Sequence, residues 1–438
     1  MTDSGRIVPP SRLAPVAGLR LELGMEIRTP LYDEQGNLLL ARHQIISTPS
    51  LLRSLREHPA LFTDAQALRQ TVRSVMSSFE KAHRQDSRLA DLPHAGVAAA
   101  PGEAEADPAD IRITRRPDTP TLPLHERWTT FERRLGGVLA SLNLGGKTAQ
   151  DALPRLFELH DLLLELVQQD LPGALFLVFN RTSSGLNGYS VLHAMQCAVV
   201  AWDAARRLPV SNAESRVLVL SALTMNVSIK TLQDQMAIQR AKASQEQLAR
   251  VARHAIESGN CLREAGVTDA LWLEVVDRHH DELPYYPAIN DRPPAEKLAK
   301  ILQVIDRFTA ALSPRGTRPS RSSKEAVKSV IREHAHSEND EVALDLMINL
   351  GLYPPGTCVR LASGAIGVVL KRGTQPNMPL VVPLTNPQGD ALGSFRVWDS
   401  SDPKYAVQQS VPSSMLKVRV NEALLLNLLA GLSQTGGY

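Results

Sequence analysis

Residues 295–312 read AEKLAKILQVIDRFTAAL, with apolar side chains at every third or fourth position. This spacing places Leu298, Ile305 and Phe308 along one side of an α-helix, which would pack that side against a core. Asp306 lies at the border of the apolar stripe, where a carboxylate is costly unless it meets a positive charge or a cation. An arginine could satisfy it as well as a metal ion could. The stretch therefore predicts a buried helix with an acidic residue at its edge.

The same helical spacing recurs towards the N-terminus and changes to a β-type pattern after Gly351. Helical segments are predicted at residues 124–142, 151–171, 190–208, 215–227 and 420–432. Short β-type runs separated by Gly, Pro and Asn occur at residues 358–362, 365–372, 379–386 and 395–399. The sequence therefore predicts a mainly α protein, in which a helical bundle precedes a small β-rich C-terminal unit.

The N-terminal part predicts a second small β-rich unit over residues 19–64. Apolar alternations broken by Gly24 and by a turn at residues 34–36 are typical of strands and a hairpin, and Pro49 opens a short helix. Residues 84–123 are rich in Ala, Pro and Asp, which indicates a flexible linker. The predicted domains are residues 1–83 (N-terminal accessory domain), 84–125 (linker), 126–352 (helical domain) and 353–438 (C-terminal β unit with a closing helix).

Charge and apolar content exclude several classes of partner. Lysine and arginine number 48 against 46 aspartates and glutamates, so we expect neither nucleic acid nor an anionic membrane as a partner. The most apolar internal run, Val217–Val227, is shorter than the ~20 residues that cross a bilayer. The first residues, MTDSGRIVPPSRLAP, contain no apolar export segment, so we expect a cytoplasmic protein. Cys197, Cys261 and Cys358 are far apart and predict buried, reduced thiols.

Four histidines accompany Asp306 as candidate metal ligands. His279 and His280 end the predicted helix TDALWLEVVDRHH, and adjacent side chains on a helix diverge by about 100°. Both would meet one site only at the helix end, and a surface pair is the alternative. His193, in YSVLHAMQC, and His254, in QLARVARHAIESG, are unremarkable taken singly.

The order of the whole set is more specific. Tyr189-x-x-x-His193 is followed by His254, by His279-His280 with Tyr286-Pro287, and by Asp306 in ILQVIDRFTA. This order resembles the HD-GYP family of bacterial cyclic di-GMP phosphodiesterases, a branch of the HD metal-dependent phosphohydrolases. The resemblance runs from about Leu175 to Tyr353 and implies an HD-type helical bundle. It implies five metal ligands, namely His193, His254, His279, His280 and Asp306.

The resemblance also implies a place for the ligand. Arg315 and Arg318, in SPRGTR, occupy positions where family members carry basic residues that hold ligand phosphates. A guanidinium fork suits phosphate oxygens, although solvated loop charge is an equal alternative. Tyr286, at the surviving end of the signature loop, is the third candidate ligand-binding residue.

The centre of the family's motif is altered. Where the family reads roughly ALLHDIGK, residues 222–229 read ALTMNVSI, so Met225-Asn226 replaces the His-Asp pair and Ile229 replaces a lysine. The family's aspartate bridges two metals, whereas Asn226 is neutral and Met225 is a soft thioether. Tyr189 stands where an acidic ligand is expected. The family's HHExxDGxGYP loop is the shorter, glycine-free HHDELPYYP at residues 279–287.

These departures predict a protein without a catalytic residue at Met225, Asn226 or Ile229. We expect a catalytically degenerate HD-GYP-like regulator that binds a signalling protein, such as a GGDEF-type protein, or cyclic di-GMP. It would hold no cofactor, or one iron or manganese ion at a weakened site, and it would act alone or as a homodimer. The alternative is a metal-dependent phosphodiesterase with an altered metal site.

Overall fold

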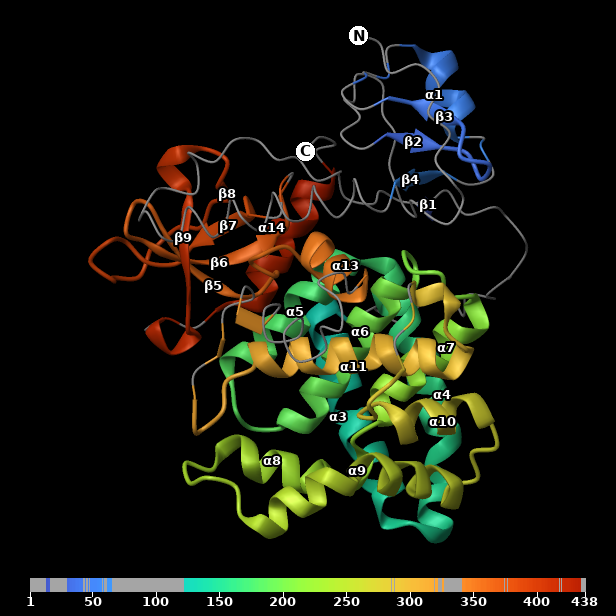
Figure 1. The fold of residues 1–438 in the computed structure, drawn as a ribbon. Helices are drawn as coiled ribbons and strands as arrows, with labels where there is room; N and C mark the ends of the chain where they lie inside the picture. Colours follow the sequence, from blue (N-terminus) through green and yellow to red (C-terminus); the bar gives the residue numbers. More distant parts are fainter. Residues whose placement is uncertain are drawn as a thin grey trace. The chain divides into compact units, whose positions relative to one another are not determined.

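Figure 1 shows the computed structural model of the chain, which divides by its internal contacts into two units, Met1–Thr119 and Pro120–Tyr438. In the second unit the structure describes residues 122–318 except 285 and 287, residues 320–321 and 325–326, and residues 341–434 except 374, 376, 417 and 419. In the first unit it describes residues 13–15, 30–41, 44, 46, 48–56, 58 and 61–64. The predicted linker at 84–125 lies almost wholly outside the described residues.

The N-terminal unit contains the predicted hairpin and helix. Strands β1 (Leu13–Pro15), β2 (Leu31–Tyr32), β3 (Leu38–Leu40) and β4 (Phe62–Asp64) form an antiparallel sheet in the order β1-β4-β2-β3, beside helix α1 (Pro49–Arg56). Asp33 fixes the hairpin turn, because its carboxylate accepts hydrogen bonds from the backbone N–H groups of Gln35 and Asn37 at 2.9 and 2.8 Å. Leu31, Leu40, Ile46 and Leu55 form its small core. The strand expected within residues 19–29 lies outside the described residues.

The mainly α prediction is confirmed in the second unit. Its helices are α3 (Leu124–Leu144), α4 (Gly146–Gln169), α5 (Leu171–Ser184), α6 (Tyr189–Ala205), α7 (Asn212–Thr224), α8 (Lys230–Ile238), α9 (Gln245–Glu264), α10 (Ala270–Arg278), α11 (Pro294–Leu312) and α13 (Glu341–Leu350). Short 3-10 turns η3 (Val227–Ile229) and η4 (Ile289–Asp291) precede α8 and α11.

Helix α6 is the centre of the bundle. All of its residues are buried, and it packs against α5, α7, α8 and α11. A helix that is apolar all round must be covered on every side. Helix α11 packs across α6 and α10, and Asp306 is only 8% exposed on it. The residue expected at the border of the stripe is therefore buried.

The C-terminal β pattern also forms a sheet. Strands β5 (Cys358–Leu361), β6 (Ile366–Lys371), β7 (Leu380–Pro383), β8 (Trp398–Asp399) and β9 (Val407–Val411) pair antiparallel in the order β8-β7-β6-β5-β9. Strand β9 was not predicted, because its residues, VQQSV, lack the continuous apolar run of the other strands. Helix α14 (Glu422–Gln434) is the predicted closing helix.

Gly356 brings this sheet against the bundle. Its φ of 80° lies in the left-handed region, and a Cβ there would come within 2.4 Å of the backbone nitrogen of Asn180 on α5. Its own N–H donates to the carbonyl of Val369 on β6 at 2.7 Å. Bundle and sheet thus belong to one unit, and the predicted domain boundaries at 83, 125 and 352 stay predictions.

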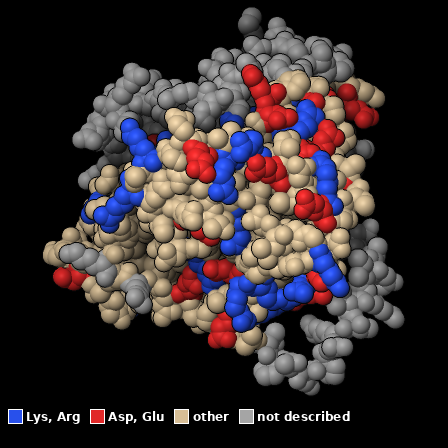
Figure 2. Space-filling view, turned by 90° about the horizontal axis from the view of Figure 1, so that it is seen from below, with Lys and Arg blue, Asp and Glu red and all other residues tan. Residues whose placement is uncertain are grey.

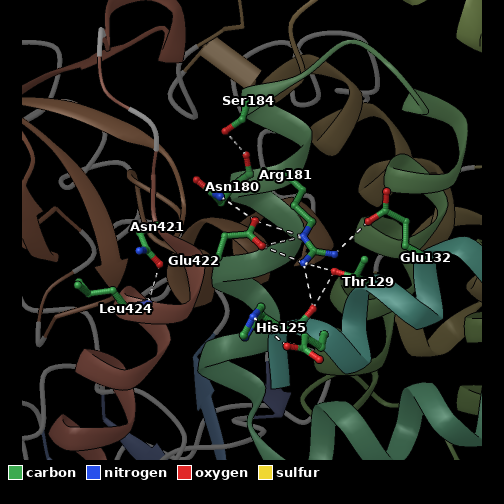
Figure 3. A network of polar contacts seen from close by, with 10 residues as sticks. His125, Thr129, Glu132, Asn180, Arg181, Ser184, Asn421, Glu422 and Leu424 are labelled. Carbon is green, nitrogen blue, oxygen red and sulfur yellow. Dashed lines mark hydrogen bonds and ion pairs between the residues drawn. The ribbon is translucent and has the colours of Figure 1, made fainter. Parts of the chain in front are cut away.

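A largely buried arginine, whose side chain is 12% exposed, joins α14 to the bundle (Figure 3). The Arg181 guanidinium donates to the Glu422 carboxylate at 2.9 Å and to the Glu132 carboxylate on α3 at 3.0 Å. It also donates to the hydroxyl of Thr129 at 3.1 Å, and Asn180 donates to Glu422 at 3.1 Å. Burial would lower the pKa of Arg181, but the two glutamates raise it. These contacts, which we call the Arg181 network, hold helix α14 against the bundle.

Replacing Arg181 with Met should loosen α14. The change leaves the 22% exposed Glu422 and the 33% exposed Glu132 without their cation, so we expect the free energy of unfolding to fall by about 2–3 kcal/mol. Hydrogen exchange should accelerate in Glu422–Gln434. Arg127→Met is the matched control, because its partner Glu165 is 63% exposed and such pairs contribute about 0–1 kcal/mol. Unchanged exchange in α14 would contradict the prediction.

Charge is mixed on the face seen in Figure 2, where basic and acidic side chains are interspersed rather than gathered by sign. Among the described residues, no single helix is both long and apolar enough to cross a membrane. Helices α4 and α5 meet both conditions only when they are taken together, and they are bent by 114° at the break between them.

Candidate metal and ligand site

The five predicted ligand residues meet between four helices. His193 lies on α6, His254 on α9 and Asp306 on α11, while His279 ends α10 and His280 follows it. The Asp306 carboxylate is 2.7 Å from His193 Nε2 and 3.8 Å from His280 Nε2. The Nε2 atoms of His254 and His279 are 3.2 Å apart. Residues up to 113 positions apart in sequence are thus in one cluster, which we call the His/Asp cluster.

His254 and His279 point unshared electron pairs at each other. Nδ1 of His254 is 2.5 Å from the carbonyl of Val251, and Nδ1 of His279 is 2.7 Å from the carbonyl of Val276. A carbonyl only accepts, so each Nδ1 carries the hydrogen, and each neutral ring keeps its lone pair on Nε2. Two lone pairs at 3.2 Å repel unless a cation or a proton lies between them. This arrangement suits a metal ion.

The end of α10 lets both adjacent histidines reach the cluster. His279 caps that helix and is fully buried, which is inconsistent with a pair of surface histidines, whereas the side chain of His280 is 36% exposed. Burial, reinforced by the charges of His280 and His254, lowers the pKa of His279 to about 3. Burial also lowers the pKa of His280, although Asp306 opposes this. Both rings are therefore neutral at pH 7 and able to bind a metal.

His193 and Asp306 form a separate ion pair within the cluster. Burial would raise the pKa of Asp306, but the hydrogen bond and charge of His193 lower it below its usual range. Burial disfavours a charged His193, yet Cys197, Tyr189 and Asp306 together raise its pKa well above the usual value. The pair thus carries opposite charges that satisfy each other.

Cys197 is a neighbour that the sequence analysis treated only as a buried thiol. It is fully buried, its Sγ lies 3.8 Å from His193 Nδ1, and it is 3.2 Å from the hydroxyl of Thr309. With His193 and Asp306 it forms a second group of ligand-type atoms within 4.8 Å of one another. The sequence could have indicated Cys197, because it lies one helical turn after His193 and therefore on the same face of the helix.

The altered motif lies beside His254. Met225 ends α7 and is 1% exposed, and Asn226 precedes η3. Ser228, in η3, donates from its hydroxyl to the carbonyl of His254 at 3.0 Å, so this segment is held against α9. Ile229 is 2% exposed and offers no charge.

The donor set fits one metal ion better than two. One ring nitrogen each of His254, His279 and His280 lie within 4.8 Å of one another, and Asp306 adds an oxygen near His280. Three imidazoles and one carboxylate are an adequate set for one divalent ion. A second ion would need a bridging carboxylate, and Asn226 supplies only an amide.

The predicted ligand-binding residues lie in different surroundings. The Arg315 guanidinium lies 3.7 Å from the ring centroid of Tyr189, whose ring stacks on His193 at 5.2 Å and 14°. Arg318 instead donates to backbone carbonyls of residues 310, 311 and 313 at the end of α11. Tyr286 lies under the guanidinium of Arg292 at 4.9 Å. Only the ring of Tyr189 thus lies between Arg315 and His193 of the His/Asp cluster. Arg318 instead caps the C-terminal end of α11. The ligand-binding role of Arg315, Arg318 and Tyr286 stays a prediction.

Gly316 allows the loop that carries Arg315 to approach α8. Its N–H donates to the carbonyl of Ala237 at 2.7 Å, and a Cβ on Gly316 would lie 2.5 Å from the carbonyl oxygen of Gln239. Any side chain here would push the loop from α8 and draw Arg315 away from Tyr189.

No protein-family profile matches the chain. A cyclic di-GMP phosphodiesterase of Pseudomonas aeruginosa is 24% identical over 186 residues, which cover 42% of this chain and 45% of that protein. An HDGYP protein of Bdellovibrio bacteriovorus superposes with a TM-score of 0.38 at 14% identity, over 76% of this chain and 98% of that one. The match with the phosphodiesterase spans less than half of either protein. Together with the family's order of ligand-type residues, it supports the assignment of this chain as an HD-GYP-like protein.

Proposed function

We propose that this chain is a catalytically degenerate HD-GYP-like regulator, which acts by binding rather than by hydrolysis. One observation carries the proposal: Met225 and Asn226 occupy the positions of the family's His-Asp pair, in the segment that Ser228 holds against His254, while the other ligand-type residues still gather. Two-metal hydrolysis depends on a carboxylate that bridges the metals and holds the attacking hydroxide. A buried thioether and a neutral amide do neither.

The binding partner would belong to bacterial cyclic di-GMP signalling. The relative in Pseudomonas aeruginosa is named for its action on cyclic di-GMP, which motivates this dinucleotide or a GGDEF-type signalling protein as the partner. The nearly equal numbers of basic and acidic residues give no reason to propose nucleic acid or a membrane surface. A cytoplasmic location and a homodimer belong to the same proposal.

A second candidate is a one-metal phosphodiesterase. The facing Nε2 atoms of His254 and His279, with His280 and Asp306 close by, favour it. An iron or manganese ion held there would act as a Lewis acid on a phosphoryl oxygen. His254, His279, His280 and Asp306 would then hold the ion, and burial would keep His279 and His280 neutral. Arg315 would neutralise the negative charge of the substrate phosphate.

Metal content and turnover distinguish the two candidates. We expect purified protein supplied with iron or manganese to bind at most one ion per chain, measured by elemental analysis, and to hydrolyse neither cyclic di-GMP nor a generic phosphodiester. Turnover that rises with metal occupancy, and that disappears in His279→Ala, would refute the regulator and support the enzyme. Binding of cyclic di-GMP without hydrolysis, measured by calorimetry, would identify the dinucleotide as the ligand.

A further inference from the structure

Helix α9 carries large apolar side chains on its solvent side. Leu248 and Ile256 are 48% and 54% exposed, and Ala252 between them is exposed as well. Since successive residues turn by about 100° on a helix, the three side chains fall within about 80° and form one line, which we call the α9 stripe. The interior side of α9 holds His254 of the His/Asp cluster with small residues and Leu262. The α9 stripe is thus an apolar surface that the bundle does not cover.

A further exposed apolar side chain lies at the end of α8. Ile238 is 52% exposed, and the amides of Gln239 and Gln247 exchange hydrogen bonds at 3.2 and 3.0 Å, which hold the end of α8 at the start of α9. Three of the seven large apolar side chains that are exposed in the described structure thus lie on these two helices. Single exposed apolar residues need no explanation, whereas a group on adjoining helices indicates an interaction surface.

Opposite charges lie along one flank of the α9 stripe. Glu246 is exposed, and its carboxylate forms no hydrogen bond or ion pair with any described residue. The side chain of Arg253 is 63% exposed and pairs with Glu257 at 3.1 Å, one turn further along the same helix. Glu246 and Arg253 are seven residues apart, so they project from the same side of α9 about 10 Å from each other. The flank therefore presents an unpaired carboxylate and, two turns later, a guanidinium.

We infer that the α9 stripe packs on the α9 stripe of a second copy of this chain, with the two helices antiparallel about a twofold axis. An interface between identical copies must be self-complementary, because each contact occurs twice across the axis. An axis that passes α9 beside Arg250 places Leu248 over Ala252 of the second copy, since position 250 is midway between them. The same axis places Glu246 opposite Arg253 of the second copy, since their midpoint lies within one residue of 250. A single axis thus matches a large side chain with a small one and a negative charge with a positive one.

The charges also disfavour the parallel arrangement. A parallel pair of α9 helices would set Glu246 beside Glu246 and Arg253 beside Arg253, and like charges across an interface are repulsive. One helix from each copy gives an interface at the small end of specific complexes, so we expect a dissociation constant on the order of 10 μM. The inference rests on the proposed function, of which the homodimer is a part, and specifies its surface. His254 lies on the opposite side of α9 and stays uncovered.

Leu248→Glu should weaken the dimer by at least about tenfold, because the interface would bury a carboxylate without a partner. Sedimentation equilibrium of the full chain, over a concentration series that spans the dissociation constant, measures this change. Met415→Glu is the matched control, since Met415 is 47% exposed and lies near β9, outside α8 and α9. It should leave the dissociation constant unchanged. Circular dichroism and the melting temperature verify that each variant is folded.

Reversing the charges tests the twofold axis itself. Glu246→Arg alone, or Arg253→Glu alone, sets like charges against each other at two symmetric places and should raise the dissociation constant about tenfold. The double variant restores opposite charges across the axis, so its dissociation constant should return close to that of the wild type. Each residue lies on the solvent side of α9, so the fold should tolerate all three changes.

Three results would overturn the inference: a monomeric wild-type protein, an unchanged dimer in Leu248→Glu, or a double charge reversal that dimerises no more tightly than the single variants. A monomeric wild type would remove the homodimer and leave the metal and turnover assays of the regulator as they are. Turnover by the purified protein would refute the regulator and leave the sedimentation results standing. Failure of the interface and failure of the proposed function are therefore distinguishable.

Discussion

Replacing Arg207 with Met is expected to lower the free energy of unfolding by about 3–5 kcal/mol. Arg207, in the turn that follows α6, lies 2.6 Å from the carboxylate of Asp203 on that helix and 2.8 Å from the carboxylate of Asp345 on α13. The three side chains are 9%, 8% and 11% exposed. Methionine keeps most of the packing and removes the only positive charge of this triad. Asp345 would lose its ion pair, and Asp203 would keep only the charge of the nearby Arg372.

The loss should depend on pH in a defined direction. Burial raises the pKa of Asp345 even though Arg207 opposes this. Without Arg207 that pKa rises further. A carboxyl whose pKa is raised by folding destabilises the protein above its unfolded-state pKa, and the full loss is reached above its folded-state pKa. The difference between variant and wild type should therefore narrow as the pH falls from about 7 towards 5.

Arg134→Met is the control for this prediction. Arg134 pairs with Glu158 at 3.1 Å, but the two side chains are 43% and 66% exposed, so the change should cost about 0–1 kcal/mol. Urea unfolding of both variants at the two pH values measures the difference. Equal losses for Arg207→Met and Arg134→Met would show that burial of the triad does not matter.

His279→Ala is expected to weaken divalent metal binding by at least about 100-fold, since loss even of outer hydrogen bonds to a metal site costs 10–100-fold. It removes the fully buried imidazole whose Nε2 faces that of His254 at 3.2 Å. Only His254, His280 and Asp306 would remain as donors. The Nε2 lone pair of His254 would no longer face that of His279, so the two atoms would no longer favour a cation between them.

Metal competition titrations and thermal unfolding measure this loss. A metal that binds only the folded protein stabilises it by RT ln(1 + [metal]/Kd), so the metal-dependent rise in melting temperature should disappear in His279→Ala. His125→Ala is the control, because the side chain of His125 lies on α3 and is 31% exposed. If His279→Ala and wild type bind metal equally, the ion is held elsewhere and the His/Asp cluster is not the site.

The sequence predicted helices α3, α4, α6, α7, α11 and α14 because helical periodicity is a local property, whereas α5, α8 and α13 were not among the predicted segments. The stripe on residues 295–312 became the buried face of α11, and the N-terminal hairpin formed around Asp33 because its carboxylate bonds the next backbone N–H groups. Strand β9 was missed, because strand pairing depends on a neighbour that the local pattern does not reveal. The order of the histidines indicated the cluster, but their roles in it rest on the family resemblance.

Contacts between distant residues could not be predicted. Arg181 meets Glu422 at 241 positions along the chain, and Arg318 caps the carbonyls of α11 instead of lying open in a loop. Each depends on how helices cross, which periodicity does not specify. The stack of Arg315, Tyr189 and His193 depends on the close approach at Gly316.

Asp306 shows what the sequence determines and what only the tertiary structure decides. The sequence by itself determined that this carboxylate lies at the edge of a buried stripe and needs a positive partner, because residue spacing fixes the face of a helix. It equally placed Met225-Asn226 where the HD-GYP family, which the sequence resembles, carries a His-Asp pair. Only the tertiary structure decided that the partner is His193, 113 residues earlier, and not an arginine. The packing of α6 against α11 decides it, because that contact brings the two side chains within 2.7 Å.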